Sequence, residues 1–407
     1  MNHDDTTGSP RTGDPAPARV LLFMGKGGVG KTTISCASAV TTAARGHRTL
    51  LVSTDAAHSL SDVLATPCGA EPAAVAERLD VVQLDGQAEL RRSWGVIADY
   101  LRQLIGFAAV DRVHADELMV LPGLDELVAL SRLRSLITSG QWDTVVVDCA
   151  PSADSLRLLT LPDVLGFYVD RFGSTERATD RWIRKRVART LAIPAPDDVL
   201  VSSVAEFTEE LTQLRAMLTH PHVSARIVVT PERVVVAEGL RTLSYLALYG
   251  FSADAVVVNR APRPELAGTV LAEWAARQQA QLDDIESSFA PLPRLVALHR
   301  LAEPVGLEAL ADLGGQLYGE VDPAGRLAEV EPIEIRSHDG ETAVRVFLPG
   351  VDRHEVQLER AGDELALTLG SRRRLVHIPA GLTGRSIVRA GFTQPHLEIV
   401  FGVPAHV

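Results

Sequence analysis

The chain has 407 residues, and 46% of them are hydrophobic, which is enough for two or three domains with buried cores. Its 40 Lys and Arg against 52 Asp and Glu leave a formal net charge of −12, which argues against general binding to nucleic acids or anionic membranes. Three cysteines without pairing or metal-type spacing indicate a reducing cytoplasm, and no window approaches the ~20 apolar residues of a stable membrane span.

The N-terminal part combines a polar tail with a strand, a glycine-rich turn and a helix. Residues 1–17 lack the basic start and apolar stretch of a signal peptide, and their composition predicts a disordered tail. Arg19–Met24 is an apolar run typical of a buried strand, and Ile34–Ala44 is rich in the small residues of a helix. The turn between them has the context that a phosphate-binding loop needs.

This glycine-rich turn supplies the groups that hold nucleotide phosphates. Its glycines let backbone N–H groups turn inward, and the start of the following helix adds partial positive charge. Lys31 is expected to reach the β- and γ-phosphates, and the Thr32 hydroxyl to ligate Mg²⁺. The chain has only three lysines, and two of them lie in this turn, where a slim point charge fits better than a planar guanidinium. The predicted binding residues are Gly25, Lys26, Gly27, Gly28, Val29, Gly30, Lys31, Thr32 and Thr33.

Two further strands are predicted to end in acidic residues. Arg48–Ser53 leads to Asp55, whose carboxylate would position water for in-line attack on a γ-phosphate; the alternative is a helix N-cap. Trp142–Val147 reads as a buried parallel strand that runs into Asp148. Asp148 then stands at the Walker-B position and is expected to hold Mg²⁺, directly or through a water; the alternative is a turn-forming aspartate.

The rest of the chain alternates strands with helices as far as about residue 320. Leucines recur at helical spacing within residues 88–139, and residues 170–190 form a charged helical segment that is either solvated or faces a partner. This alternation predicts an α/β fold in which helices cover both faces of a mainly parallel sheet. Further predicted strands are Leu79–Leu84, Ala225–Val229, Ala255–Val258 and Leu295–Leu298, and further helices are Ser155–Leu161, Glu206–Leu218, Gly239–Tyr249 and Leu307–Tyr318.

The C-terminal part has a different period. From Ile333 onward apolar and polar residues alternate, and turn residues recur every 8–12 positions, which predicts a small all-β sandwich. The composition changes at about residues 320–332, where we place the boundary. The predicted strands are Glu341–Leu348, Val356–Glu359, Glu364–Leu369, Arg374–Ile378 and His396–Phe401.

Several separated motifs resemble one family. Gly25–Thr33 resembles the deviant Walker A loop of Min/Par-type ATPases, nitrogenase iron protein and arsenical pump-driving ATPases. Ser53–Asp62 resembles the switch I of the arsenical pump-driving family, which includes the ATPase that targets tail-anchored membrane proteins, although Ala56 stands where that pattern usually has Pro. Asp148–Ser152 resembles its switch II, and Leu121–Glu126 and Glu303–Leu307 are similar to two more of its signature pieces.

This resemblance implies a nucleotide-gated homodimer that hydrolyses ATP with Mg²⁺. Lys26 would reach across the interface to the partner's nucleotide, as an arginine finger does, and would be catalytic together with Asp55 and Lys31. Asn259 matches an asparagine that contacts adenine. Glu232 matches a glutamate that lies near the nucleotide across the dimer.

The chain also departs from typical members. It has no Cys-x-x-Cys pair for a zinc-stapled dimer, and it has one phosphate loop where the pump branch duplicates its ATPase half. Only two methionines fall in its helical subdomain, so the leucines there either line a client groove or form an ordinary core. Cys36 and Cys149, beside the nucleotide, are interpreted as small buried residues.

The C-terminal sandwich resembles an α-crystallin or small heat-shock domain, and a branch of the family carries such a domain. The resemblance rests on Val344–Val351, Glu364–Leu369 and Ile378-Pro379. The sandwich either binds partners or is a packed structural appendage. The predicted organisation is therefore a tail (1–17), an ATPase domain (18–322) with a helical subdomain (about 88–139 and 165–220), and an α-crystallin-like sandwich (331–407).

The leading functional hypothesis is a cytoplasmic Mg²⁺-ATPase whose homodimer opens and closes a site for a hydrophobic protein client or partner. Three alternatives remain. They are a holdase that acts mainly through the sandwich, an ATPase subunit of a metalloid (arsenite) efflux system, and a Min/Par positioning ATPase. The last lacks the basic C-terminal amphipathic helix expected for membrane contact.

Overall fold

The computed structural model describes residues 17–54, 59–86, 124–149, 198–265, 270–338, 341–361, 364–370, 372–378 and 382–402. The predicted tail, most of the predicted helical subdomain and the segment from Asp55 to His58 lie outside these residues. Within them, none of the helices is both long enough and apolar enough to cross a membrane.

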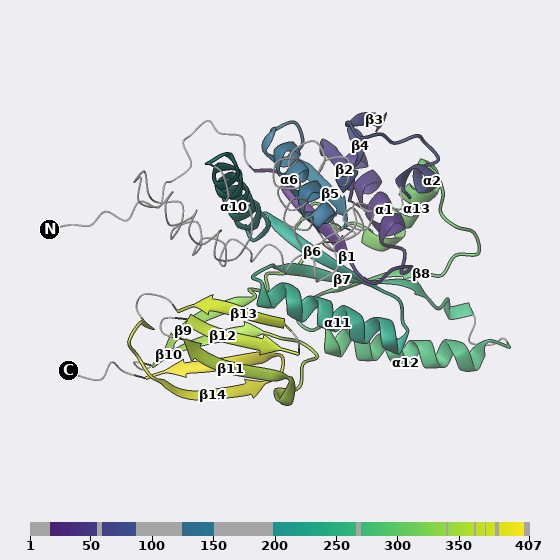
Figure 1. Cartoon of the computed structure of the whole chain (residues 1–407). Helices are drawn as coiled ribbons and strands as arrows, with labels where there is room; N and C mark the ends of the chain where they lie inside the picture. The colour runs from purple at the N-terminus through teal and green to yellow at the C-terminus, as the bar shows by residue number, and fades with distance from the viewer. Residues whose placement is uncertain are drawn as a thin grey trace, which may run out of the picture.

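The larger sheet is an α/β sheet in which the first strand of the chain lies near the middle (Figure 1). Its strands are β1 (Arg19–Met24), β2 (Thr49–Ser53), β3 (Ala73–Ala76), β4 (Leu79–Gln83), β5 (Thr144–Asp148), β6 (Val223–Val229), β7 (Ala253–Ala261) and β8 (Arg294–Leu298). Among the described residues their order is β3-β4-β2-β5-β1-β6-β7-β8, and every neighbouring pair is parallel except β3 with β4. The predicted mainly parallel sheet is confirmed.

Helices cover both faces of this sheet because its strands are apolar on both sides. Along β1, Leu22 and Met24 belong to one hydrophobic cluster, and Leu21 and Phe23 belong to another. The first cluster includes buried residues of α6 (Leu124–Thr138), α10 (Asp198–Leu218), α11 (Arg233–Leu248) and α12 (Ala272–Ser288). The second includes residues of α1 (Lys31–Ala44), α2 (Leu60–Leu64) and α13 (Leu307–Tyr318).

Two smaller antiparallel sheets form the C-terminal sandwich, as predicted. Strands β9 (Ile333–His338), β10 (Glu341–Phe347), β14 (Ile387–Thr393) and β15 (His396–Phe401) pair in the order β14-β15-β10-β9. Strands β11 (Val356–Ala361), β12 (Glu364–Leu369) and β13 (Arg372–His377) form the second sheet in that order. Inward-facing residues of both sheets, such as Val346, Leu367 and Ile399, make a common core.

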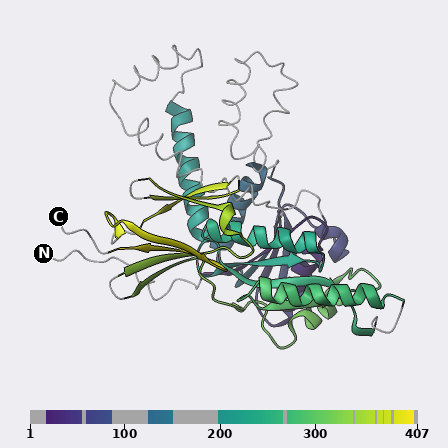
Figure 2. The same cartoon turned by 90° about the horizontal axis from the view of Figure 1, so that it is seen from below.

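The sandwich packs on α11, beside the larger sheet (Figures 1 and 2). Leu248, the last residue of α11, is 1% exposed and belongs to the core cluster of the sandwich. The buried Ser244 hydroxyl donates to the Pro349 carbonyl oxygen at 2.6 Å. The next residue, Gly350, has φ +68°, and a Cβ there would lie 2.9 Å from Leu240 Cβ. Close approach of the turn to the helix therefore requires glycine at this position.

A buried ion cluster ties the connection between the two parts to the amino-terminal edge of the larger sheet. Arg226 and Asp254 have side chains that are 0% exposed, and Arg226 Nε donates to Asp254 Oδ1 at 3.0 Å. Arg19 Nη2 donates to Asp254 Oδ2 at 2.8 Å. The connecting segment joins the cluster through its backbone, since the Ala324 and Gly325 carbonyls accept from Arg19 and Arg226. This paired cluster satisfies charges that would be costly to bury alone.

Several elements differ from the prediction. Helix α11 was expected to begin at Gly239 but begins at Arg233, because Val236 packs into the core of the larger sheet as part of the helix despite the low helix propensity of β-branched residues. Helices α2 and α12, edge strand β3 and strands β9 and β14 were not predicted as elements. Their weak or interrupted hydrophobic patterns explain this: most of α12 is solvated, and every residue of β14 is at least partly exposed.

Candidate functional site

The candidate site lies at the carboxyl-terminal edge of the larger sheet. From β1 the chain crosses to β2 on one side, and it later returns through β5 to β6 on the other side. This order makes β1 the point at which the strand order reverses, and ligands of open α/β sheets bind beyond the carboxyl ends of such strands. The glycine-rich loop follows β1 there, and Asp148 ends the neighbouring strand β5.

The loop passes close to its neighbours at two glycines. At Gly25, φ is +153°, and a Cβ would lie 2.2 Å from the Val228 carbonyl oxygen of β6. Gly30 is the left-handed N-cap of α1, and a Cβ there would lie 2.3 Å from Asn259 Nδ2. These contacts explain why the sequence has glycine at both ends of the loop. The backbone N–H groups at the start of α1 thus stand at the edge where an anion is favoured.

Asn259, near the end of β7, contacts the loop through its buried side-chain amide. Its Nδ2 donates to the Val29 carbonyl oxygen at 2.9 Å, and its Oδ1 accepts from the Arg260 N–H at 2.9 Å. The side chain is buried, and Arg260 has φ +56°. Asn259 is therefore placed beside the loop, where it fixes the orientation of the Val29 peptide.

Both lysines of the loop make local contacts. Lys31 Nζ donates to the Lys26 carbonyl oxygen at 3.3 Å, so the ammonium folds back over the loop. Lys26 Nζ forms an ion pair with Glu238 Oε2 at 3.1 Å, and the two side chains are 41% and 38% exposed. Glu238 could not be identified from the sequence, since the predicted helix began one residue after it. Its place in the second turn of α11 is what turns it toward the loop.

Thr32 and Asp148 meet beneath the loop. Thr32 Oγ1 donates to Asp148 Oδ2 at 2.6 Å, and Asp148 is 1% exposed. Because the single hydroxyl proton of Thr32 is used there, the Ser59 hydroxyl at 3.1 Å acts as donor to Thr32. Ser59 lies in the Ser53–Asp62 motif but was not expected to take part.

These oxygen atoms fit Mg²⁺, which prefers hard oxygen ligands and usually binds through one or two carboxylates, waters and substrate phosphates. The described residues contain no group of three or more His, Cys, Asp or Glu that could hold a metal ion. The described residues therefore offer no metal site built from protein ligands alone. They are compatible with a site in which Thr32 and Asp148 share Mg²⁺ with a bound phosphate.

Glu232 stands at the same edge, as the N-cap residue of α11 just after β6. Its carboxylate accepts a short hydrogen bond from the Thr230 hydroxyl, and the residue is exposed. The structure thus brings Asp148 and Asn259 together with Lys26, Lys31 and Thr32 at one loop, and Glu232 follows β6 at the same edge of the sheet. Asp55 lies outside the described residues, so its predicted position stays untested.

Cys36 and Cys149 are both buried, as the sequence interpretation expected. Burial, with a smaller contribution from Asp148, raises the pKa of the Cys36 thiol well above its usual value. The Cys36 thiol therefore stays protonated and is a weak nucleophile and metal ligand.

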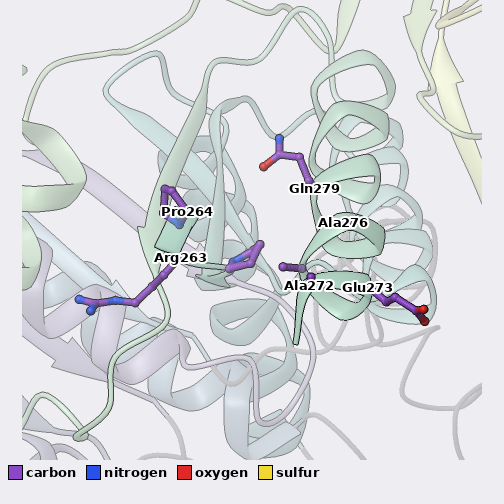
Figure 3. A pocket seen from close by; sticks show the side chains of 8 residues that line it. Arg263, Pro264, Ala272, Glu273, Ala276 and Gln279 are labelled. Carbon is purple, nitrogen blue, oxygen red and sulfur yellow. The ribbon is translucent and has the colours of Figure 1, made fainter. Parts of the chain in front are cut away.

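A pocket of about 570 Å³ opens three residues beyond Asn259, between the end of β7 and the start of α12 (Figure 3). Pro262, Arg263 and Pro264 line it on the strand side, and Ala272, Glu273, Ala275, Ala276 and Gln279 line it on the helix side. Arg263 and Glu273 point away from each other, so the pocket holds no facing pair of charges. Its apolar walls suit a flat or apolar group better than a phosphate.

Comparisons with known proteins agree with this geometry. A model of the family described as anion-transporting ATPase matches residues 18–319, and a model described as an HSP20-like domain found in ArsA matches residues 339–401. A Chlorobaculum tepidum protein named "Putative arsenical pump-driving ATPase" is 34% identical over 387 residues, covering 94% of this chain and 96% of the relative. "Protein Rv2184c" of Mycobacterium tuberculosis is 34% identical over 423 residues, covering 96% and 97%. An "ATPase ASNA1 homolog" of Trypanosoma cruzi is 30% identical over 264 residues, covering 59% and 73%.

Proposed function

This chain belongs to the anion-transporting ATPase family, and from that premise we propose that it hydrolyses ATP with Mg²⁺ as a nucleotide-gated homodimer. The nucleotide cycle would open and close a site for a hydrophobic protein client or partner, in the cytoplasm. Family membership makes the chain an ATPase. The dimer, the metal, the client and the location are the proposed parts.

The observation that carries the proposal is the contact of Thr32 with Asp148 beneath the loop. A hydroxyl at the start of α1 and a carboxylate at the end of β5 lie 2.6 Å apart, although 116 residues separate them in sequence. Neither residue is needed in a plain glycine-rich turn. Together they form the pair that holds Mg²⁺ against the phosphates in phosphate-loop enzymes.

The roles follow from position. The loop N–H groups and Lys31 would hold the phosphates, and Asn259 would keep the loop in shape beside the adenine. Thr32, together with Asp148 through a water, would hold Mg²⁺, and the ion would supply positive charge to the phosphate oxygens. Asp55 would orient the attacking water. Lys26 would stabilise charge on the partner's nucleotide, and Glu232 would lie near that same nucleotide across the dimer.

A metalloid efflux role is the second candidate, because one relative carries the name arsenical pump-driving ATPase. In this chain the buried, protonated Cys36 speaks against coordination of arsenite by its thiol. A holdase that acts through the sandwich is the third candidate, and the packing of α11 into the sandwich core favours an appendage that is part of the ATPase.

Solution scattering with an Asp55→Asn variant tests the leading proposal. ATP should convert this variant into a compact dimer, whereas ADP should not. Phosphate release by the variant should fall by about 10²-fold or more, because the attacking water is no longer oriented. Phosphate release at the wild-type rate would overturn the role of Asp55. A chain that stays monomeric with ATP would overturn the dimer.

Two further measurements separate the other candidates. Arsenite should not raise ATP turnover, and stimulation that disappears in a Cys36→Ser, Cys68→Ser, Cys149→Ser chain would favour efflux instead. Residues 330–407 can also be removed. If the shortened chain still hydrolyses ATP but no longer protects an apolar client from aggregation, the holdase is favoured.

A further inference from the structure

Helix α11 joins the phosphate loop to the sandwich. Near its start, Glu238 pairs with Lys26 of the loop. Near its end, Leu248 lies in the core of the sandwich. Ten residues separate these two positions, which is about 15 Å along an α-helix. One rigid element therefore contacts both the proposed trans lysine and the C-terminal sheets.

The contact at the loop has a consequence for dimer closure. Lys26 Nζ lies 3.1 Å from Glu238 Oε2 of its own chain. An ammonium paired there directs its charge at a carboxylate of its own chain instead of at a nucleotide bound to a second copy. The pair is half-exposed, so its hold is weak and can be exchanged for a phosphate.

The middle of α11 is fixed to the larger sheet. A Cβ on Gly239 would lie 2.6 Å from Val229 Cγ1 and 3.3 Å from Phe289 Cζ, so the helix packs closely against β6 at this residue. Glu238 directly precedes this point of close packing. Because α11 is one continuous helix, the contacts that fix its C-terminal half also bear on the position of Glu238.

The C-terminal half of α11 is held by the sandwich through several kinds of contact. Ser244 donates to Pro349, and Leu248 fills the sandwich core. The guanidinium of Arg372 lies 4.2 Å from the centre of the Tyr245 ring, and that of Arg374 lies 5.5 Å from the Tyr249 ring. Arg374 is buried, and its charge lies over the C-cap residue of α11, where a helix favours a cation.

We propose that Glu238 is a positioning residue that holds Lys26 within its own subunit in the nucleotide-free chain, and that the sandwich sets the strength of this hold by clamping the far end of α11. The sandwich then regulates how readily Lys26 becomes available to a second subunit. That last consequence rests on the proposed function, whereas the hold itself does not.

Amine labelling of the full chain without nucleotide tests the hold directly, because the chain has only three lysines. Acetylation with an N-hydroxysuccinimide ester, at less than one label per chain, is read by peptide mass spectrometry. Glu238→Gln should raise the labelling rate of Lys26 about two- to five-fold, the range expected for loss of an exposed ion pair, and should leave Lys31 unchanged. The matched control is Glu286→Gln, which removes the ion pair of Glu286 on α12 with Arg294 on β8 and should leave the labelling of Lys26 unchanged.

Two substitutions at the other end of α11 test the clamp. Leu248→Ala and the milder Arg372→Ala should each raise Lys26 labelling, while Leu211→Ala, the same truncation of a buried leucine on α10, should not. Added to Glu238→Gln, neither substitution should raise labelling further, because the hold is already lost. Unchanged Lys26 labelling in Glu238→Gln overturns the hold, and additive increases in the double variants overturn the clamp.

The outcome is separable from that of the proposed function. Labelling needs neither ATP turnover nor dimerisation. If the wild-type chain shows no ATP-dependent dimerisation but Glu238→Gln raises the labelling of Lys26, the proposed dimer is refuted and the hold is kept. A chain that turns over ATP as a dimer but shows no response would keep the dimer and refute the hold.

Discussion

The two edges of the larger sheet use charged residues in opposite ways. At the amino-terminal edge, Arg226 and Asp254 are fully buried and paired, and Arg19 closes the cluster with a side chain that is 13% exposed. At the carboxyl-terminal edge, Lys26 and Glu238 are paired but half-exposed. At the first edge, removal of one partner leaves a buried charge unpaired and destabilises the fold. At the second edge, the charges are exposed to solvent and can exchange partners. The comparison assigns stability to one edge and chemistry to the other.

The largest effect is expected at the amino-terminal edge. Asp254→Asn leaves the buried Arg226 guanidinium without its carboxylate and should lower the free energy of unfolding by about 3–5 kcal/mol. Urea unfolding followed by circular dichroism measures this. The matched control, Asp312→Asn, breaks an ion pair with Arg300 in which the aspartate is 74% exposed, and should change stability by less than about 1 kcal/mol. Equal losses in the free energy of unfolding for the two variants would contradict the proposed difference between the edges.

A substitution in the loop should reverse this pattern. Lys31→Ala removes the charge expected on the β- and γ-phosphates, and phosphate release should fall about 10²- to 10³-fold while the free energy of unfolding stays within about 0.5 kcal/mol. Arg45→Ala is the control at the other end of α1, where Arg45 contacts the Gly319 and Glu320 carbonyls, and should keep its turnover. A Lys31→Ala chain that is chiefly destabilised would place the loop among the structural elements.

Asp148 tests whether the carboxyl edge holds Mg²⁺. If it binds the ion through a water, Asp148→Asn should raise the Mg²⁺ concentration for half-maximal turnover about 10- to 100-fold. Turnover should return at high Mg²⁺, and EDTA should abolish it in both proteins. A Mg²⁺ requirement identical to that of the wild type would confine Asp148 to its hydrogen bond with Thr32.

The smallest effect is expected from the cysteines. Burial raises the pKa of the Cys36 thiol well above its usual value and that of Cys68 to a lesser extent, so maleimide should modify Cys68, which is partly exposed, before Cys36. Turnover should stay within about two-fold while Cys68 is modified, since this residue does not contact the loop. Rapid loss of turnover that follows Cys36 labelling would show that its thiol is reactive.

The sequence was sufficient for the fold class and for the neighbourhood of the loop, because both depend on local patterns. Apolar runs that end in glycine or aspartate marked β1 and β5, and strict alternation marked β12 and β15. The first turns of α11 were not predicted, since three consecutive valines resemble a strand. Packing of the segment on β6 favours the helix over the local preference.

Long-range polar contacts could not be predicted in the same way. Arg226 lies in an apolar strand where its charge gave no hint of a partner, and its pairing with Asp254 depends on how β6 and β7 align. The pair of Lys26 with Glu238 and the hydrogen bond of Ser59 with Thr32 depend equally on the arrangement of distant segments. Side-chain partners of this kind follow from the fold and carry no periodic signal.

The central claim, that Lys26 completes the site of a second subunit, is tested most directly by mixing two inactive chains. Lys26→Ala lacks the trans lysine, and Asp55→Asn lacks the proposed catalytic carboxylate, so each alone should be inactive. In a mixed dimer, the Lys26→Ala subunit keeps its own Asp55 and receives Lys26 from its partner. An equal mixture should therefore recover about one quarter of wild-type turnover, since half of the dimers are mixed and each has one complete site. Turnover no greater than the sum of the separate chains would contradict the claim.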